Sequence, residues 1–275
     1  DVCSSDLYFY CNSITSTIRL FADDSILYRQ IDGVTDSQTL QKDINHLCTW
    51  EQRWQMTFNQ SKCYTMRISH RKKPIQVDYK MGDSTLQVVT NHTYLGVEIN
   101  NKLSWATHIQ TTTSKANKIL GLLRRNLHSC SSEVKEVKAR AYKTLVRPRL
   151  IEYCSSVWDP YHKEHKIKLE GVQRRSARFV LNNNRKKESV TEMLSQLKWE
   201  PLEHRRAVQR LTFIYKSINK TVAINTDQYQ TQSNSNTRQQ LAAVSFIKPP
   251  ALKECYKFSL FPRTFAEWNK LPVEI

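Results

Sequence analysis

The sequence predicts an α+β fold, in which antiparallel strands with one helix are followed by a helical region. Short runs of β-branched and apolar residues occupy residues 12–90, which is typical of strands separated by turns. After Trp105 the apolar residues instead recur at steps of three and four, which is the spacing of a helix that faces a core. With 275 residues the chain is long enough for about two domains.

The first strands form a predicted β-hairpin over residues 12–29 (NSITSTIRLFADDSILYR), because apolar runs flank a short acidic break. We expect the turn of this hairpin at Asp23 and Asp24. A helix should follow, capped by Asp36 or Ser37. The predicted apolar face of this helix consists of Leu40, Ile44, Leu47 and Trp54. Further strands are predicted at residues 56–68, 75–81 and 85–90, with Gly82-Asp83 as the turn between the last two.

Three helices are predicted after Trp105. The core-facing stripe of the first consists of Trp105, Ile109, Thr112, Ala116, Ile119, Leu123 and Leu127. The second should span residues 133–146 and stop at Arg147-Pro148, because helical conformation is disfavoured for a residue that precedes proline. The third should span residues 164–180.

The C-terminal region is predicted to be helical over residues 189–220, with an interruption at Pro201. Residues 182–187 (NNNRKK) before it read as a loop. Residues 221–240 are poor in apolar side chains and rich in Gln, Asn, Ser and Thr, which predicts a flexible linker. The residues that follow regain aromatic side chains, among them Phe265.

Cysteine usage and hydropathy exclude several classes of protein. The seven cysteines are odd in number and scattered, with no CxxC pair, so we expect reduced thiols and neither a zinc site nor a disulfide framework. The chain has no apolar run of about 20 residues, so no transmembrane helix is predicted. Residues 1–10 lack the basic start and apolar stretch of a signal peptide, from which we expect a protein that works inside the cell.

Positive charge is concentrated in the middle of the chain. The formal net charge is +17, and residues 102–187 contain 20 Lys and Arg against 6 Asp and Glu, which places +14 of it there. A concentrated basic field indicates a polyanionic partner, and nucleic acid is the first candidate. An anionic membrane surface is the weaker candidate and we expect no membrane partner, because the predicted helices carry core-facing stripes. The oligomeric state is not readable from the sequence.

The sharpest chemical feature is Phe21-Ala22-Asp23-Asp24. Two adjacent carboxylates in a tight turn repel each other unless water or a divalent cation offsets their charge. Hard oxygen ligands suit Mg²⁺, or Mn²⁺ in its place, and nucleotidyl transfer uses two such ions about 3.5–4 Å apart. An acidic pair without further motifs around it is more often an ordinary surface turn, where Asp is common.

The surrounding motifs make a family resemblance specific. An aromatic-x-Asp-Asp box between two strands resembles the catalytic palm hairpin of reverse transcriptases. The following motifs, in this order, resemble reverse transcriptases of non-LTR (LINE-type) retrotransposons: WQMTFNQSKC at 54–63, YLGV at 94–97, VRP at 146–148, VWDPY at 157–161, LEGVQRR at 169–175 and FPRT at 261–264. The resemblance extends from about residue 12 to residue 275, and its strength lies in the order and spacing of motifs that are individually weak.

This resemblance implies an RNA-directed DNA polymerase that binds an RNA template, a DNA primer and deoxynucleoside triphosphates. It implies a partial palm over residues 1–95, a basic helical thumb over 96–185 and a helical C-terminal region over 186–275. It also implies a cytoplasmic ribonucleoprotein that reaches the nucleus. The Cys/His zinc motif that the family carries near its C-terminus is not seen here.

By resemblance, Asp23 is a metal ligand and Asp24 assists beside it. Lys62 lies where the family has a lysine that protonates the departing pyrophosphate, and a cation there would stabilise the charge that grows on the leaving group. One more surface lysine in a basic protein is the alternative interpretation of Lys62.

Two further groups of residues are expected to contact nucleic acid. The resemblance implies that Tyr94, Leu95 and Gly96 form the turn that steadies the primer end, although an ordinary strand end would also place Gly in a tight bend. Charge and helical spacing predict that the backbone of the template–primer duplex is contacted by Lys115, Lys118, Arg124 and Arg125. A merely solvated helix face is the alternative for these four side chains.

The resemblance also implies that part of the catalytic site is missing. The family needs another metal-binding aspartate on an earlier palm strand, and fingers that bind the nucleotide, so we expect an N-terminally truncated chain that is inactive alone. Residues 1–7 (DVCSSDL) back-translate to a common sequencing-library adapter, which indicates an assembly artefact, and a diverged native segment is the alternative. The alternative functions are a non-catalytic basic module that binds nucleic acid, and a genomic relic without function.

Overall fold

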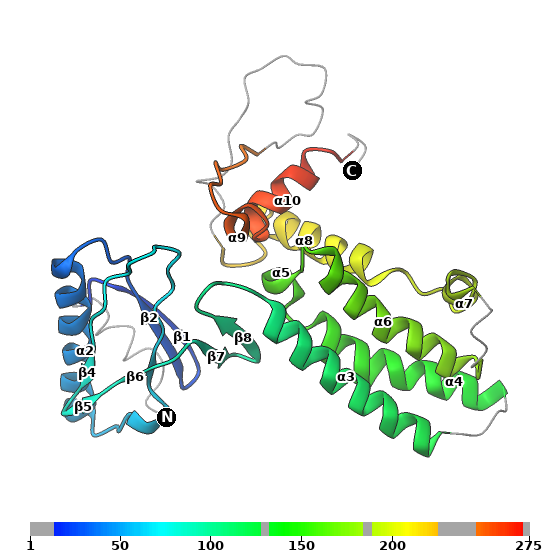
Figure 1. The fold of residues 1–275 in the computed structure, drawn as a ribbon, viewed down its shortest axis with the longest axis horizontal. Coiled ribbons are helices and arrows are strands. Elements are labelled where there is room, and N and C mark those ends of the chain that lie inside the picture. The colour runs from blue at the N-terminus through cyan, green and yellow to red at the C-terminus, as the bar shows by residue number, and fades with distance from the viewer. Residues whose placement is uncertain (1–13, 128–131, 184–188, 225–245, 272–275) are drawn as a thin grey trace, which may run out of the picture. The chain divides into compact units, whose positions relative to one another are not determined.

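A computed structural model describes residues 14–127, 132–183, 189–224 and 246–271 (Figure 1). The chain divides into two compact units, Asp1–Tyr94 with Ile99–Leu103, and Leu95–Glu98 with Ser104–Ile275. Among the described residues the strands lie before residue 101 and the later elements are helical, as expected for an α+β protein. The predicted division into a partial palm, a thumb and a C-terminal region, with boundaries at residues 95 and 185, stays a prediction.

The first unit begins with the predicted hairpin. Strands β1 (Thr17–Phe21) and β2 (Asp24–Tyr28) pair antiparallel, with Phe21 opposite Asp24. The expected turn at Asp23-Asp24 is therefore wrong by one residue, because Asp24 already belongs to a strand and the turn is Ala22-Asp23. Ala22 has a φ of 52°, and this left-handed conformation provides the twist that a two-residue hairpin turn needs.

Helix α2 (Val34–Trp54) follows. Its N-cap is Gly33 rather than Asp36 or Ser37, and the Asp36 carboxylate accepts the N–H groups of Gly33 and Asp32, both at 3.0 Å. The side chains that α2 buries are Ser37, Asp43, Ile44, Leu47 and Trp50. Trp54 was expected on this face but is 41% exposed, because the last turn of α2 extends past the small core that Trp50 already covers.

The remaining strands of the first unit are much shorter than predicted. The expected strand at residues 56–68 is wrong: Gln60–Lys62 forms a 3-10 turn (η2), because the Asn59 carbonyl accepts the Lys62 N–H at 2.9 Å. The strands that do form are β3 (Tyr64–Thr65), β4 (Lys80–Met81), β5 (Ser84–Thr85) and β6 (Gln87–Val88). β3 pairs parallel with β6, and β4 pairs antiparallel with β5 across the predicted turn at Gly82.

A two-stranded hairpin, β7 (Asn91–Tyr94) and β8 (Val97–Asn100), precedes the helices. The helices of the second unit are α3 (Ala106–Asn126), α4 (Ser132–Ala141), the π-helix η3 (Tyr142–Glu152), α5 (Ser155–Trp158), α6 (Lys163–Val180), α7 (Val190–Gln196), α8 (Leu202–Ile218), α9 (Glu254–Lys257) and α10 (Leu260–Trp268). The predicted bounds of α6 and the predicted break at Pro201 are confirmed.

The predicted stop at Arg147-Pro148 is wrong. Helix α4 runs on without a break as the π-helix, which contains Pro148 and ends at Glu152. The proline ring crowds the carbonyl four residues earlier in an α-helix, and the wider turn of a π-helix gives this ring more room, although Pro148 still donates no hydrogen bond. Burial of Tyr142, Val146 and Ile151 on one side of this segment holds it in place.

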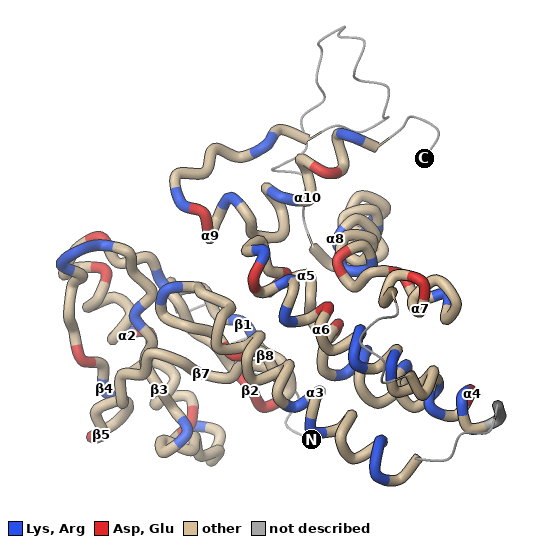
Figure 2. Tube along the Cα trace, turned by 45° about the vertical axis from the view of Figure 1, so that its right-hand side comes forward, with Lys and Arg blue, Asp and Glu red and all other residues tan. Residues whose placement is uncertain are grey.

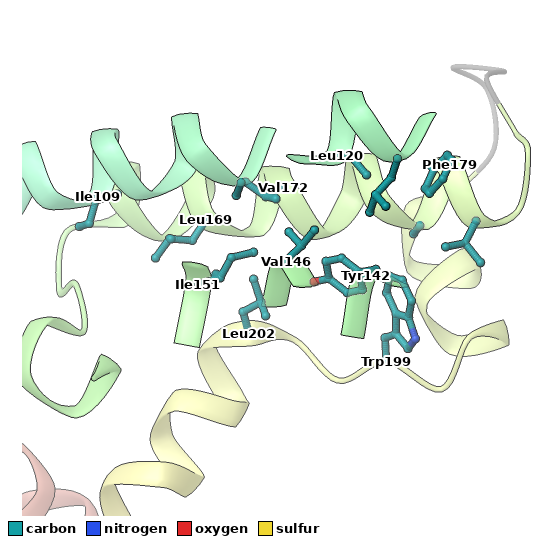
Figure 3. Packing of buried hydrophobic residues seen from close by; sticks show 14 of the residues in the cluster. Ile109, Leu120, Tyr142, Val146, Ile151, Leu169, Val172, Phe179, Trp199 and Leu202 are labelled. Atoms are coloured by element: carbon teal, nitrogen blue, oxygen red, sulfur yellow. The ribbon is translucent and has the colours of Figure 1, made fainter. Parts of the chain in front are cut away.

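The main core lies between α3, the π-helix and α6 (Figure 3). The predicted stripe of α3 is confirmed, with Ile109 and Ala116 fully buried. The Tyr142 and Trp199 rings stack with centroids 4.4 Å apart, and the Tyr142 hydroxyl donates to Gln173 Oε1 at 3.0 Å. The first contact holds the segment between α7 and α8 on the π-helix, and the second joins the π-helix to α6.

A second core in this unit is aromatic and joins α8 to α10. It consists of Ile214, Phe246 and Phe265, and the two phenylalanine rings stack 4.2 Å apart. Residues 1–7, most of the predicted loop at 182–187 and most of the predicted linker at 221–240 lie outside the described residues. No helix among the described residues combines the length and the apolar character needed to cross a lipid bilayer.

Candidate active site and nucleic-acid interface

The paired carboxylates lie at the tip of the β1–β2 hairpin. Asp23 is in the turn, Asp24 opens β2, and both side chains are exposed. Phe21 is 63% exposed and lies directly opposite Asp24, so these two side chains share one face of the hairpin. The tip therefore presents hard oxygen ligands that a divalent cation can reach from solvent.

The hairpin is attached to α2 through Asp43, which is 2% exposed. Its carboxylate accepts the N–H groups of Thr15 at 3.1 Å and Ser16 at 2.8 Å, and the Thr15 hydroxyl at 3.2 Å. Burial alone would raise the pKa of Asp43, but these hydrogen bonds outweigh it and the pKa is lowered. A charged Asp43 thus fixes the start of the strand that leads to Asp23.

Lys62 is exposed at the end of the η2 turn in the same unit. This placement agrees with both interpretations of Lys62, so its role stays a prediction. Within the described part of the chain, the structure brings together no group of three or more His, Cys, Asp or Glu side chains that could hold a metal ion.

The predicted primer-positioning residues form the turn between β7 and β8. Tyr94 ends β7, and Leu95 and Gly96 have φ values of 46° and 78°. Two positive φ values in a two-residue turn match the tight hairpin geometry that favours glycine. The Tyr153 hydroxyl donates to the Leu95 carbonyl at 3.0 Å, which fixes the turn on the second unit.

We expect Gly96→Ala to destabilise the second unit by about 1–2 kcal/mol, because a Cβ is strained at this φ. The new Cβ would also lie 3.1 Å from Tyr153 Cε1 and would displace the ring that holds Leu95. Urea unfolding measures the change. Gly121→Ala in α3 is the matched control, since its Cβ meets only the Arg125 guanidinium at 3.9 Å, and it should stabilise by about 0.5–1 kcal/mol. Equal effects of the two substitutions would contradict the prediction.

The four predicted cations of α3 are all exposed, but they do not share one face. Lys118 and Arg125 are seven positions apart and lie opposite the buried stripe, whereas Lys115 and Arg124 lie on opposite flanks of the helix. Figure 2 marks the Lys and Arg positions of α3 and α6 in blue. A polyanion on this surface would therefore meet Lys118 and Arg125 first.

Arg124 lies against α6, where sequence reasoning did not single out its partner Arg175. Arg124 donates to the Arg175 carbonyl at 3.1 Å, and Arg175 Nε donates to Asn117 Oδ1 at 3.0 Å. Burial, followed by the Arg124 charge, lowers the pKa of Arg175. Among the described residues neither guanidinium pairs with a carboxylate, so two neighbouring cations remain without a counter-ion.

Comparison with known proteins finds a distant similarity to one curated protein. The chain is 23% identical over 186 residues to a probable RNA-directed DNA polymerase from transposon BS of Drosophila melanogaster. The match covers 66% of this chain, which spans a fifth of the length of that relative. No protein-family model and no solved structure matches the chain. The chain is thus similar to part of a transposon polymerase.

The structure also shows a buried charge cluster in the second unit that sequence reasoning missed. Asp159, which directly follows α5, is 5% exposed and contacts three arginines. Asp159 Oδ1 accepts Arg206 Nε at 2.6 Å, Arg210 donates to the other oxygen, and Arg263 lies 3.2 Å away. Burial lowers the pKa of Arg206 and of Arg210. The cluster joins the end of α5 to α8 and α10.

Proposed function

We propose that this chain is part of the reverse transcriptase of a non-LTR retrotransposon. In this proposal the first unit is part of the palm, and α3 to α6 belong to the thumb. The single observation that carries it is the exposed acidic pair at the tip of an antiparallel hairpin, in a chain similar to a transposon RNA-directed DNA polymerase. The reaction is extension of a DNA primer on an RNA template.

The residues of the hairpin have distinct roles in this proposal. Asp23 presents its carboxylate oxygens to a divalent cation, Mg²⁺ or Mn²⁺, and Asp24 adds negative charge beside it. When bound there, such a cation would supply activation of the primer 3′-oxygen and compensation of the negative charge on the leaving pyrophosphate. Lys62 supplies the proton that the pyrophosphate takes up. Since the reaction needs carboxylates from separate strands, this chain by itself should not extend a primer.

The test is primer extension with deoxynucleoside triphosphates on an RNA template, by a polymerase that carries this chain. Extension that requires both the RNA template and Asp23 is the expected result. A non-catalytic module that binds nucleic acid is the alternative function, and the uncompensated cations of α3 and α6 favour it equally. The alternative would be favoured if the polymerase still bound nucleic acid through this chain but its DNA synthesis did not change when Asp23 was replaced.

The basic surface of α3 should bind an RNA–DNA hybrid mainly through phosphates. We expect the logarithm of the affinity to fall linearly with the logarithm of salt concentration, with a slope of roughly −0.7 to −0.9 per phosphate contacted. Reversal of Lys118, Arg124 and Arg125 to glutamate should weaken binding at least about tenfold for all sequences alike. Fluorescence anisotropy with labelled hybrids measures both effects.

The matched control for this charge reversal replaces Lys42, Lys216 and Lys220 by glutamate. These three lysines are exposed, and they lie outside the basic segment of residues 102–187. The control changes the net charge by the same amount, so it should lower the affinity only slightly. Equal losses in the two variants, a flat salt response, or a loss confined to one sequence would contradict phosphate binding on α3.

A further inference from the structure

A surface pocket of about 220 Å³ lies in the second unit, away from the cations of α3. It is formed by α9, α10, the start of α6 and the residues just before each of α6 and α9. The aromatic and basic side chains that line the pocket and carry the argument are Tyr161, Lys248, Lys257, Phe258, Arg263 and Lys270. No role was assigned to this part of the chain from the sequence, and the proposed polymerase reaction does not use it.

One wall of the pocket is aromatic. The rings of Tyr161 and Phe258 stack with centroids 4.4 Å apart and planes inclined by 10°. The His162 ring also contacts Tyr161, with centroids 4.0 Å apart, and both members of the stacked pair are partly buried, so part of their ring surface remains exposed. The Lys257 ammonium lies 5.4 Å from the centre of the Phe258 ring. A flat apolar surface therefore lies next to a positive charge.

Three lysines at the rim have no ion-pair partner among the residues that the structure describes. Lys248, Lys257 and Lys270 are exposed, and none forms an ion pair with a carboxylate among the described residues. The acidic lining residue, Glu267, is already engaged, because its carboxylate accepts Arg210 at 2.7 Å and Arg263 at 3.4 Å. Glu254 of α9 adds a negative charge near Tyr161, so the rim of three lysines keeps an excess of positive charge within the described part of the chain.

Ion pairs with buried residues hold the part of the pocket that α10 forms. Arg263 lines the pocket and pairs with the buried Asp159 at 3.2 Å, which also binds Arg206. Glu267, one turn further along α10, pairs with the buried Arg210 of α8. These contacts fix α10 against α8, so the side of the pocket that Arg263 and Glu267 form is in place before any ligand binds, which lowers the cost of binding.

We propose that this pocket binds a nucleotide of single-stranded nucleic acid. The base packs on the uncovered surface of the Tyr161–Phe258 pair, and the phosphates meet Lys248, Lys257 and Lys270. Aromatic surface beside uncompensated cations is the combination that binds single strands, because every base has a flat face and every linkage a negative charge. A duplex fits less well, since its bases are stacked on each other, and an acidic peptide would leave the aromatic wall without a partner.

Photocrosslinking of the whole chain tests the proposal. The probe is a single-stranded oligodeoxyuridylate that carries 5-iododeoxyuridine, which crosslinks to aromatic side chains on irradiation. We expect crosslinks at Tyr161 or Phe258, located by mass spectrometry of peptides. The double variant Lys257→Glu/Lys270→Glu should lower their yield at least about tenfold, because rim phosphates lose their partners. Lys216→Glu/Lys220→Glu carries the same charge change on exposed positions outside the pocket and should leave the yield nearly unchanged.

The outcomes separate this proposal from the proposed polymerase function. Crosslinks confined to peptides of α3 and α6 would overturn the pocket proposal and leave the duplex surface in place. Crosslinks at Tyr161 or Phe258 could persist when the charges of Lys118, Arg124 and Arg125 are reversed to glutamate. This result would support binding in the pocket even if α3 did not bind a duplex. Displacement of the probe by polyglutamate at lower concentration than by unlabelled oligodeoxyuridylate would overturn the proposal in favour of an acidic protein partner.

Discussion

Alanine in place of Asp23 should lower DNA synthesis at least about a hundredfold in a polymerase that carries this chain, because loss of a metal ligand removes several kcal/mol of transition-state stabilisation. Binding of the template–primer hybrid should change little, since the cations proposed to hold the duplex lie on α3. Primer extension with Mg²⁺ and with Mn²⁺ measures synthesis, and anisotropy measures binding.

The chain offers a matched control for this substitution. Asp83 is also an exposed aspartate in a two-residue hairpin turn, between β4 and β5 of the same unit. Asp83→Ala removes the same charge from the same kind of turn and should leave synthesis nearly unchanged. Retention of about a tenth of the synthesis rate by Asp23→Ala would exclude Asp23 as an essential metal ligand.

Asparagine in place of Asp159 should destabilise the second unit by about 3–5 kcal/mol, because it removes the charge that compensates buried arginines. Arg206 is fully buried and Arg210 is 2% exposed, and both point at the Asp159 carboxylate. Asparagine keeps the shape of the side chain, so the loss reports charge rather than packing. Urea unfolding followed by circular dichroism measures it, since this unit contains the long helices α3, α6 and α8.

The control for Asp159 is a surface ion pair in the same unit. Glu164 and Lys168 of α6 pair at 2.7 Å with side chains that are 73% and 43% exposed. Solvent screens such a pair, so Glu164→Gln should cost less than about 1 kcal/mol. If Asp159→Asn were as mild as this control, the arginines of α8 and α10 would be held by packing alone, and the proposed rigid wall of the pocket would lose its support.

Local sequence signals predicted the long helices well. The expected helix at residues 164–180 is observed as Lys163–Val180, and the expected break at Pro201 directly precedes α8. Helical period and proline chemistry act over neighbours within one or two turns, so the chain carries them wherever it folds. The hairpin around Ala22-Asp23 was predicted for the same reason, with an error of one residue in its turn.

Local signals failed where the surroundings decide the conformation. Residues 56–68 alternate like a strand, yet Tyr64–Thr65 alone pairs there, because a strand needs a neighbour to receive its hydrogen bonds. Pro148 should end a helix by local rules, but the burial of Val146 and Ile151 around it maintains a π-helical turn instead. Trp50, and not Trp54, covers the core because the core under α2 is short.

The candidate site likewise combines features that the sequence predicts with features that only the tertiary structure shows. The sequence by itself determined that Asp23 and Asp24 lie at the tip of a hairpin, with an error of one residue in its turn, and that the segment of α3 is rich in cations. Tertiary structure alone showed that Arg175 lies beside Arg124 and that Asp159 is enclosed by three arginines. These partners are separated by about fifty residues or more, and only packing of α3 on α6 and of α10 on α8 brings them within hydrogen-bonding distance.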